Sequence, residues 1–293
     1  MSKLILLVTI IILSSCSSIP NKESTKYLEF TDGISQLTNS LMSNLQRFKL
    51  FEDTSYIVLN PFLDVDNGQI LQASLDIEKL IIAETQENFK RIKIARINPE
   101  KLTNAKYILN GIIKYEANKS AQKKHYKISA SIIDLTNSTI VVNHTVYIQS
   151  LGLNYQPTPS YQDNPMYFKG KPLQDIISSV NSPVGSKIDT NYYDFVKIKA
   201  LLTVAQSVYD EGKYKQAYAL FKNILEQPGG KIIETYGGLY AVTFKLGRLK
   251  EAEANFAEMI AIAMQQGALP IKFLFKTNLT DFLDIHELKQ QYN

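Results

Sequence analysis

Apolar residues that recur every three or four positions predict two amphipathic helices in the first third of the chain. The apolar face of the first helix consists of Ile34, Leu37, Leu41 and Leu45. The second helix continues to about Phe89, and Glu78 and Glu84 are expected to point away from its apolar face. That face consists of Leu71, Leu75, Leu80, Ile81 and Phe89.

Between and after these helices the pattern becomes that of β-strands. Strands are expected at residues 55–62, 92–97, 107–115, 125–135 and 139–148. Apolar and polar residues alternate from Lys127 to Ile133, as in an antiparallel strand with one exposed face. Turn residues at 134–138 predict a hairpin. Residues 27–150 therefore predict an α+β domain whose helices lie on one face of a mostly antiparallel sheet.

A pattern with a period of 35 residues follows. Gly212, Tyr214, Ala217 and Phe221 recur as Gly247, Leu249, Ala252 and Phe256. The glycines would end a helix in a left-handed conformation, the alanines would let two helices approach closely, and the phenylalanines would fill the space between hairpins. The spacing is similar to that of the tetratricopeptide repeat, with a period of about 34 residues. Residues 191–267 thus predict an all-α tetratricopeptide-like array, an unrelated four-helix array being the alternative.

The segments on either side of the expected array have a different character. Residues 151–190 contain a proline-rich stretch with tyrosines and predict a linker whose aromatic residues pack onto the first domain, with peptide binding as the alternative. Residues 268–293 contain an expected strand at 271–275 and a short helix at 285–292. This tail resembles the start of an OmpA-like peptidoglycan-binding domain, but the chain ends before the residues with which that family grips the cell wall.

The N-terminus has the layout of a secretory signal peptide. Lys3 precedes an apolar run of ten residues, Leu4 to Leu13, and two serines stand directly before Cys16, the only cysteine. Ten apolar residues are too few to cross a bilayer, which takes about 20. The segment is either the signal of a lipoprotein or, as the alternative, an ordinary signal peptide or short hydrophobic anchor with an incidental cysteine.

The segment Leu13-Ser14-Ser15-Cys16 resembles the bacterial lipoprotein signal. The resemblance implies removal of residues 1–15, lipidation of Cys16 and a tether at residues 16–26. Ser17 stands where enterobacterial lipoproteins of the inner membrane have aspartate, so the resemblance implies the periplasmic face of the outer membrane. Several acyl chains would hold the protein stably, since one chain anchors only marginally.

Composition narrows the class of protein. A hydrophobic content of 45% and a charged content of 20% are those of a globular chain. The net charge of +4 falls to about +3 when Lys3 is removed, too small and dispersed a surplus to indicate a nucleic-acid partner. With its only cysteine lipidated, the chain would have no intramolecular disulfide and no cysteine-based metal site.

The order of elements in residues 27–150 resembles a periplasmic α/β domain found in several lipoproteins: the flagellar lipoprotein FlgO, the curli secretion lipoprotein CsgG and the activators of penicillin-binding proteins. The matching segments are residues 103–119 and 125–148, a strand with a central glycine followed by a hairpin. The curli channel adds membrane-spanning strands, for which residues 120–124 leave no room. This departure from the curli channel disfavours a pore.

Candidate chemistry is sparse. His125, His144 and His286 lack metal-ligand spacing, and His125 and His144 are expected near Ile148 and Ser129 across the sheet. The turn that contains Asp64 departs from a calcium loop at its sixth and twelfth positions, and its side chains are expected to cap the following helix instead.

No catalytic motif or cofactor loop is evident, so we expect no cofactor and no enzymatic activity. The expected function is a non-enzymatic scaffold that binds envelope proteins through its helical repeats during envelope or surface-appendage assembly. The alternative is a regulator of peptidoglycan synthesis or cell-wall attachment that contacts peptidoglycan-associated proteins. A secretion-channel subunit is a third, weaker possibility.

Overall fold

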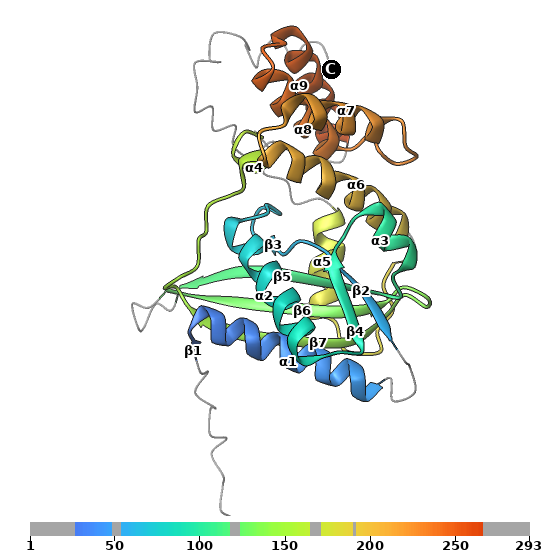
Figure 1. The fold of residues 1–293 in the computed structure, drawn as a ribbon. Helices are drawn as coiled ribbons and strands as arrows, with labels where there is room; N and C mark the ends of the chain where they lie inside the picture. The colour runs from blue at the N-terminus through green and yellow to red at the C-terminus, as the bar shows by residue number, and fades with distance from the viewer. Residues whose placement is uncertain (1–26, 49–53, 118–123, 165–170, 190–191, 266–293) are drawn as a thin grey trace, which may run out of the picture.

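The computed structural model describes residues 27–48, 54–117, 124–164, 171–189 and 192–265. Figure 1 shows a sheet with helices on both faces and a group of helices at one side. The strands are β1 (Tyr27–Leu28), β2 (Ser55–Leu59), β3 (Leu63–Asp64), β4 (Ile92–Arg96), β5 (Tyr107–Ala117), β6 (Lys124–Asp134) and β7 (Thr139–Gln149). The helices are α1 (Phe30–Phe48), α2 (Gln72–Asn88), α3 (Pro99–Asn104), α4 (Pro159–Gln162), α5 (Lys171–Asn181), α6 (Tyr192–Asp210), α7 (Tyr214–Leu225), α8 (Ile233–Lys245) and α9 (Leu249–Gln265).

The sheet is mixed, with strand order β1-β7-β6-β5-β2-β4. β5, β6 and β7 are three long antiparallel strands, and β6 and β7 are joined by the tight turn expected at 134–138. The other pairs are parallel: β1 with β7, β2 with β4 and β5, and β3 with β5. The short parallel strands therefore extend the antiparallel centre on both sides.

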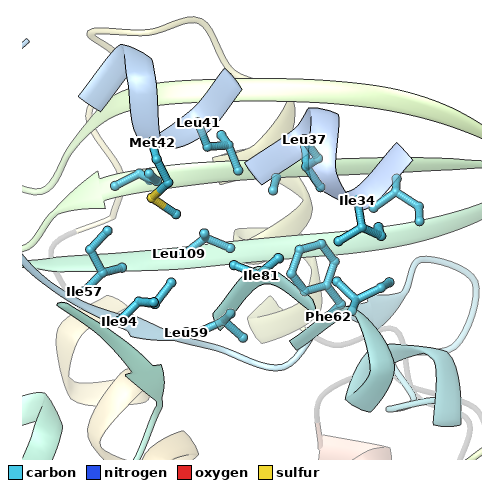
Figure 2. Packing of buried hydrophobic residues seen from close by; sticks show 14 of the residues in the cluster. Ile34, Leu37, Leu41, Met42, Ile57, Leu59, Phe62, Ile81, Ile94 and Leu109 are labelled. Carbon is cyan, nitrogen blue, oxygen red and sulfur yellow. The ribbon is translucent and has the colours of Figure 1, made fainter. Parts of the chain in front are cut away.

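One face of the sheet is covered by α1 and α2 (Figure 1). Their buried side chains meet those of β2, β4, β5, β6 and β7 in one apolar core, part of which Figure 2 shows. The predicted apolar face of α1 is confirmed, because Ile34, Leu37, Leu41 and Leu45 are all at most 1% exposed. At about 25 cal/mol per Å² of apolar surface, burial of such side chains is the main stabilising contribution.

The opposite face of the sheet is covered by α3, α5 and the start of α6. A second core joins Val58, Ile108, Ile112 and Ile133 of the sheet to these helices. Neighbouring residues of one strand point to opposite faces, so Ile57 and Leu59 enter the first core while Val58 enters the second. The central strands are thus buried on both faces.

The predicted fold class is wrong in its description of the sheet. We expected a mostly antiparallel sheet with helices on one face, whereas the sheet is mixed and has helices on both. The segment between 151 and 190, expected as a linker, contains α5, which contributes Leu173, Ile176 and Val180 to the second core. A helix that covers the second face explains why short strands such as β2 are apolar on both sides.

The predicted tetratricopeptide-like array is also wrong as a description of the C-terminal helices. α6 belongs to two cores at once: Tyr192, Val196 and Ala200 pack on the sheet, whereas Leu202 and Tyr209 pack against α7 and α8. α7, α8 and α9 then follow as successive neighbours (Figure 1). α6 therefore joins the sheet to the C-terminal helices, while α7, α8 and α9 pack in apolar cores of their own.

Candidate functional site

Cys16, to which the sequence assigns a lipid, lies outside the described residues, as do the expected signal peptide, tether and C-terminal tail. The described chain begins at Tyr27 in β1, the strand at one edge of the sheet, which pairs in parallel with β7 so that Tyr27 is opposite Tyr147. In Figure 1, β1 and β4 lie at opposite edges of the sheet. The fold is therefore entered at one corner of the sheet.

Aromatic rings surround this corner. The ring of Tyr27 lies 4.6 Å from that of His125 and 6.4 Å from that of Tyr147. The Nε2 atom of His125 lies 3.4 Å from the Oε2 atom of Glu116, whose Oε1 atom is 3.2 Å from the Nζ atom of Lys114. His125 is only 7% exposed because these neighbours enclose it. The entry point of the chain is thus held by packing and by charge.

The side chains at this corner share one face of the sheet. Lys114 is opposite Lys127, Lys127 is opposite Tyr147, and Tyr147 is opposite Tyr27, so the four residues form a row across β5, β6, β7 and β1. Directly opposite residues of neighbouring strands point to the same face. We call this surface the tether face: Tyr27, Lys114, Glu116, His125, Lys127, Tyr147 and Gln149.

Helix α5 covers only the other half of the same sheet face. Asn110 donates a hydrogen bond to the hydroxyl of Ser179 (3.0 Å), and Asn143 donates to the carbonyl of Ser182 (2.8 Å). Asn110 also donates to the hydroxyl of Tyr192, a group whose pKa is raised by burial. Among the described residues, the row that contains Lys114 lies beyond these contacts, and the Lys114 side chain is 50% exposed.

The eight predicted repeat residues lie in the helices and turns between Asp210 and Gln265. Gly212 and Gly247 have φ angles of 75° and 71°, in the left-handed region that favours glycine. Ala217, Phe221, Ala252 and Phe256 are buried, with Phe221 packed against Gly238 of α8. Tyr214 packs against the ring of Tyr209, whereas Leu249 is 54% exposed. These residues are spread over two apolar cores and two turns and do not converge on one site.

The other candidates from the sequence differ in detail from expectation. His125 and His144 lie opposite Gln149 and Ala130, one position from the expected partners, because the register shifts between Ile132 and Ile133. His286 lies outside the described residues. Burial lowers the pKa of His144. Within the described part of the chain no group of three or more His, Cys, Asp or Glu side chains could hold a metal ion.

The turn that follows β3 is stabilised by its own side chains. Asp64 accepts a hydrogen bond from the amide of Asp66 (3.0 Å), and Asn67 accepts one from the amide of Gln69 (2.9 Å). Burial raises the pKa of the Asp64 carboxyl, and hydrogen bonds from Asp66 and Tyr155 partly offset that effect. The expected cap of α2 by these side chains is therefore wrong; Ser74 instead accepts a bond from the amide of Leu71.

One carboxyl on α2 is buried and has a raised pKa. Glu78 is 4% exposed, and its Oε2 atom lies 3.2 Å from the Nε atom of Arg96 at the end of β4. Burial raises the pKa of Glu78 to about 7, while the charges of Arg96 and Lys79 act in the opposite direction. The Oε1 atom of Glu78 is buried without a hydrogen bond. Because the Glu78 carboxylate is buried and only partly compensated, its ionisation lowers the stability of the folded state.

Two further carboxylates hold α4 against the C-terminal helices. Asp210, at the end of α6, accepts a hydrogen bond from the amide of Ser160 (2.6 Å), and burial raises its pKa. Asp163 accepts a bond from the hydroxyl of Tyr209 (2.7 Å) and lies 3.0 Å from the Nζ atom of Lys245. Both contacts fasten the segment after β7 to the helices.

No family model, curated protein or solved structure matches the chain. Among the helices of the described ranges, none has the length and apolar character needed to cross a bilayer. The tether face contains Tyr27, at which the chain enters the fold, and so it is the described surface most directly related to the predicted anchor.

The sequence interpretation missed this surface and the buried Glu78. Part of the tether face could have been predicted from the sequence. Antiparallel pairing of β5 with β6 in the correct register places Lys114 opposite Lys127. No local pattern places Tyr27 beside Tyr147, since the pairing joins opposite ends of the domain.

Proposed function

We propose that the chain is a non-enzymatic lipoprotein, anchored through Cys16 in the outer membrane, that acts at the periplasmic face through contacts with other envelope components. The observation that carries the proposal is the position of Cys16, the only cysteine, after a ten-residue apolar run and two small residues. The entry of the chain at a corner of the sheet supports it, because a tether attached there leaves the rest of the domain accessible.

The proposal of a binding role is also supported by how the described polar groups are used. Asp163 and Asp210 fasten α4 to α6, and Asn110 ties β5 to α5 and α6. Each of these groups contacts structural partners within the fold. A role in the assembly of the envelope or of surface appendages requires an anchor and a surface, and it requires no reacting group.

Cys16→Ala is expected to abolish lipid attachment. Cells that produce the wild-type chain should incorporate labelled palmitate into it and retain it in the membrane fraction, and the Cys16→Ala chain should incorporate none. Because uncleaved residues 1–15 could hold the variant at the membrane, the variant is best secreted behind a cleavable leader in their place, and it should then appear in the soluble periplasmic fraction. Ser18→Ala is the matched control and should behave as wild type. Equal palmitate incorporation by the Cys16→Ala chain would refute the anchor.

Ser17→Asp is expected to change the membrane in which the protein resides. In an enterobacterial host, aspartate directly after the lipidated cysteine should retain the protein in the inner membrane, whereas the wild type should fractionate with the outer membrane on a density gradient. Ser17→Ala serves as the control and should remain in the outer membrane. An unchanged distribution of the Ser17→Asp chain would contradict the outer-membrane assignment and leave the lipid anchor intact.

A further inference from the structure

We propose that the tether face lies against the membrane that holds Cys16 and that Lys114 and Lys127 bind the phosphates of anionic phospholipids there. The inference rests on the lipid anchor proposed above and adds an orientation and a ligand to it.

The first argument is distance. Eleven residue steps separate Cys16 from Tyr27, which at about 3.5 Å per residue span at most about 39 Å. A compact fold of this size has a radius of gyration of about 18 Å and hence a diameter of about 45 Å. The tether is therefore too short for the corner that contains Tyr27 to lie on the side of the fold that faces away from the lipid surface.

The second argument is charge. Lys114 and Lys127 stand directly opposite each other on the same face of an antiparallel pair, where like charges repel. Glu116 is the carboxylate of this face, and it is shared between Lys114 at 3.2 Å and His125 at 3.4 Å. One carboxylate thus faces two lysines and a histidine. A phosphate between the two lysines would relieve their repulsion, and anionic lipid attracts basic residues close to its surface.

The third argument is the kind of side chain beside the lysines. Tyr27 and Tyr147 are partly exposed and present amphipathic rings, which favour the boundary between water and lipid. Lysine can extend its apolar stem along such rings and keep its ammonium group among the headgroups. A row of two lysines and two tyrosines on an open sheet face therefore suits a headgroup layer better than a purely aqueous or a purely apolar environment.

The test uses the full lipidated chain in vesicles, with Cys16 occupied by lipid so that an introduced cysteine is the only free thiol. Gln149→Cys places a fluorophore on the tether face, and Lys222→Cys places one on the exposed side of α7 as the matched control. Vesicles contain phosphatidylcholine alone or with phosphatidylglycerol, and a quencher attached to lipid headgroups reports proximity. We expect several-fold stronger quenching at position 149 than at position 222, and more with phosphatidylglycerol than without it.

Charge variants identify the ligand. Lys114→Gln with Lys127→Gln should bring quenching at position 149 down to the level of position 222, and the single Lys127→Glu, which can pair with Lys114 across the strands, provides a second variant that keeps the fold. Equal quenching at the two positions would overturn the inference, and equal quenching with and without phosphatidylglycerol would overturn the recognition of anionic lipid. Failure of the chain to float with the vesicles would instead overturn the lipid anchor itself.

Discussion

Gly111→Val is expected to lower the free energy of unfolding by about 3 kcal/mol. Gly111 lies in the middle of β5, and a Cβ atom added there would overlap the ring of Phe62. Phe62 is fully buried in the core beneath α1 and α2, so the ring cannot move aside without displacing its neighbours (Figure 2). Urea unfolding followed by circular dichroism measures the loss, which is a large part of the 5–15 kcal/mol typical of a domain.

A double-mutant cycle separates this clash from a general intolerance of valine. Phe62→Ala alone should cost about 3–5 kcal/mol through the cavity it leaves. Valine at position 111 would fill part of that cavity, so the cost of the double variant should be clearly less than the sum of the two single costs. Lys93→Val, on the exposed side of the edge strand β4, should change stability by less than about 0.5 kcal/mol. Additive costs would mean that the ring does not contact position 111.

Local patterns predicted the long antiparallel strands closely. Alternating side chains and the turn residues at 134–138 placed β6 and β7 within two residues of their bounds. Both signals arise within the segment itself, because the side chains of a half-buried strand alternate and a turn needs particular residues. The parallel pairings were not predicted, since β1 consists of two residues whose partner, β7, lies at the far end of the domain.

Helix α5 shows how composition can hide a periodic signal. Its apolar residues Leu173, Ile176 and Val180 have helical spacing and are buried, but they follow a proline-rich stretch that favoured a linker. Because this helix was not predicted, the second face of the sheet was expected to be uncovered. The predicted fold class, with helices on one face only, was wrong for that reason. The 35-residue period likewise reflects real packing at Ala217 and Ala252, but sequence spacing alone could not reveal that α6 also belongs to the core of the sheet.

Glu78 was placed on the wrong side of its helix for a physical reason. The buried arc of α2 includes polar positions, Ser74, Glu78 and Thr85, alongside Ala73, Ile77 and Ile81, so a search for apolar residues alone misjudges its orientation. The partner of Glu78 is Arg96 on a strand, and only the tertiary fold brings the two together.

Glu78→Gln is expected to stabilise the protein above pH 7 and to remove part of the dependence of its stability on pH. In the folded chain burial raises the pKa of Glu78 from 4.5 to about 7, so between these values the folded state keeps a proton that the unfolded state releases. The free energy of unfolding must therefore fall as the pH rises through this window, and the penalty is complete above about pH 7. The shift corresponds to about 3 kcal/mol at most, and we expect a gain of about 2 kcal/mol for the variant at about pH 8.

The gain should be smaller than the full shift because glutamine leaves Arg96 without its carboxylate partner. The Nε atom of Arg96 is buried without a hydrogen bond, so it loses its nearest carboxylate. The Arg96 side chain as a whole is 33% exposed and lies in the field of Asp210, which limits that cost. Near pH 4.5 the wild-type group is protonated in the fold, and the stabilities of the two chains should approach each other. Urea unfolding of both chains at several pH values between about 4.5 and 8 measures this convergence.

Glu87→Gln is the matched control, because Glu87 lies on the same helix and is exposed. Its free energy of unfolding should differ from that of the wild type by less than about 0.5 kcal/mol at every pH. Arg96→Met should have the opposite effect to Glu78→Gln, since loss of the guanidinium removes an interaction that lowers the pKa of Glu78 and therefore deepens the penalty at high pH. Identical pH slopes for the wild type and Glu78→Gln would show that the carboxyl is already ionised at no cost, with Arg96 and water solvating it fully.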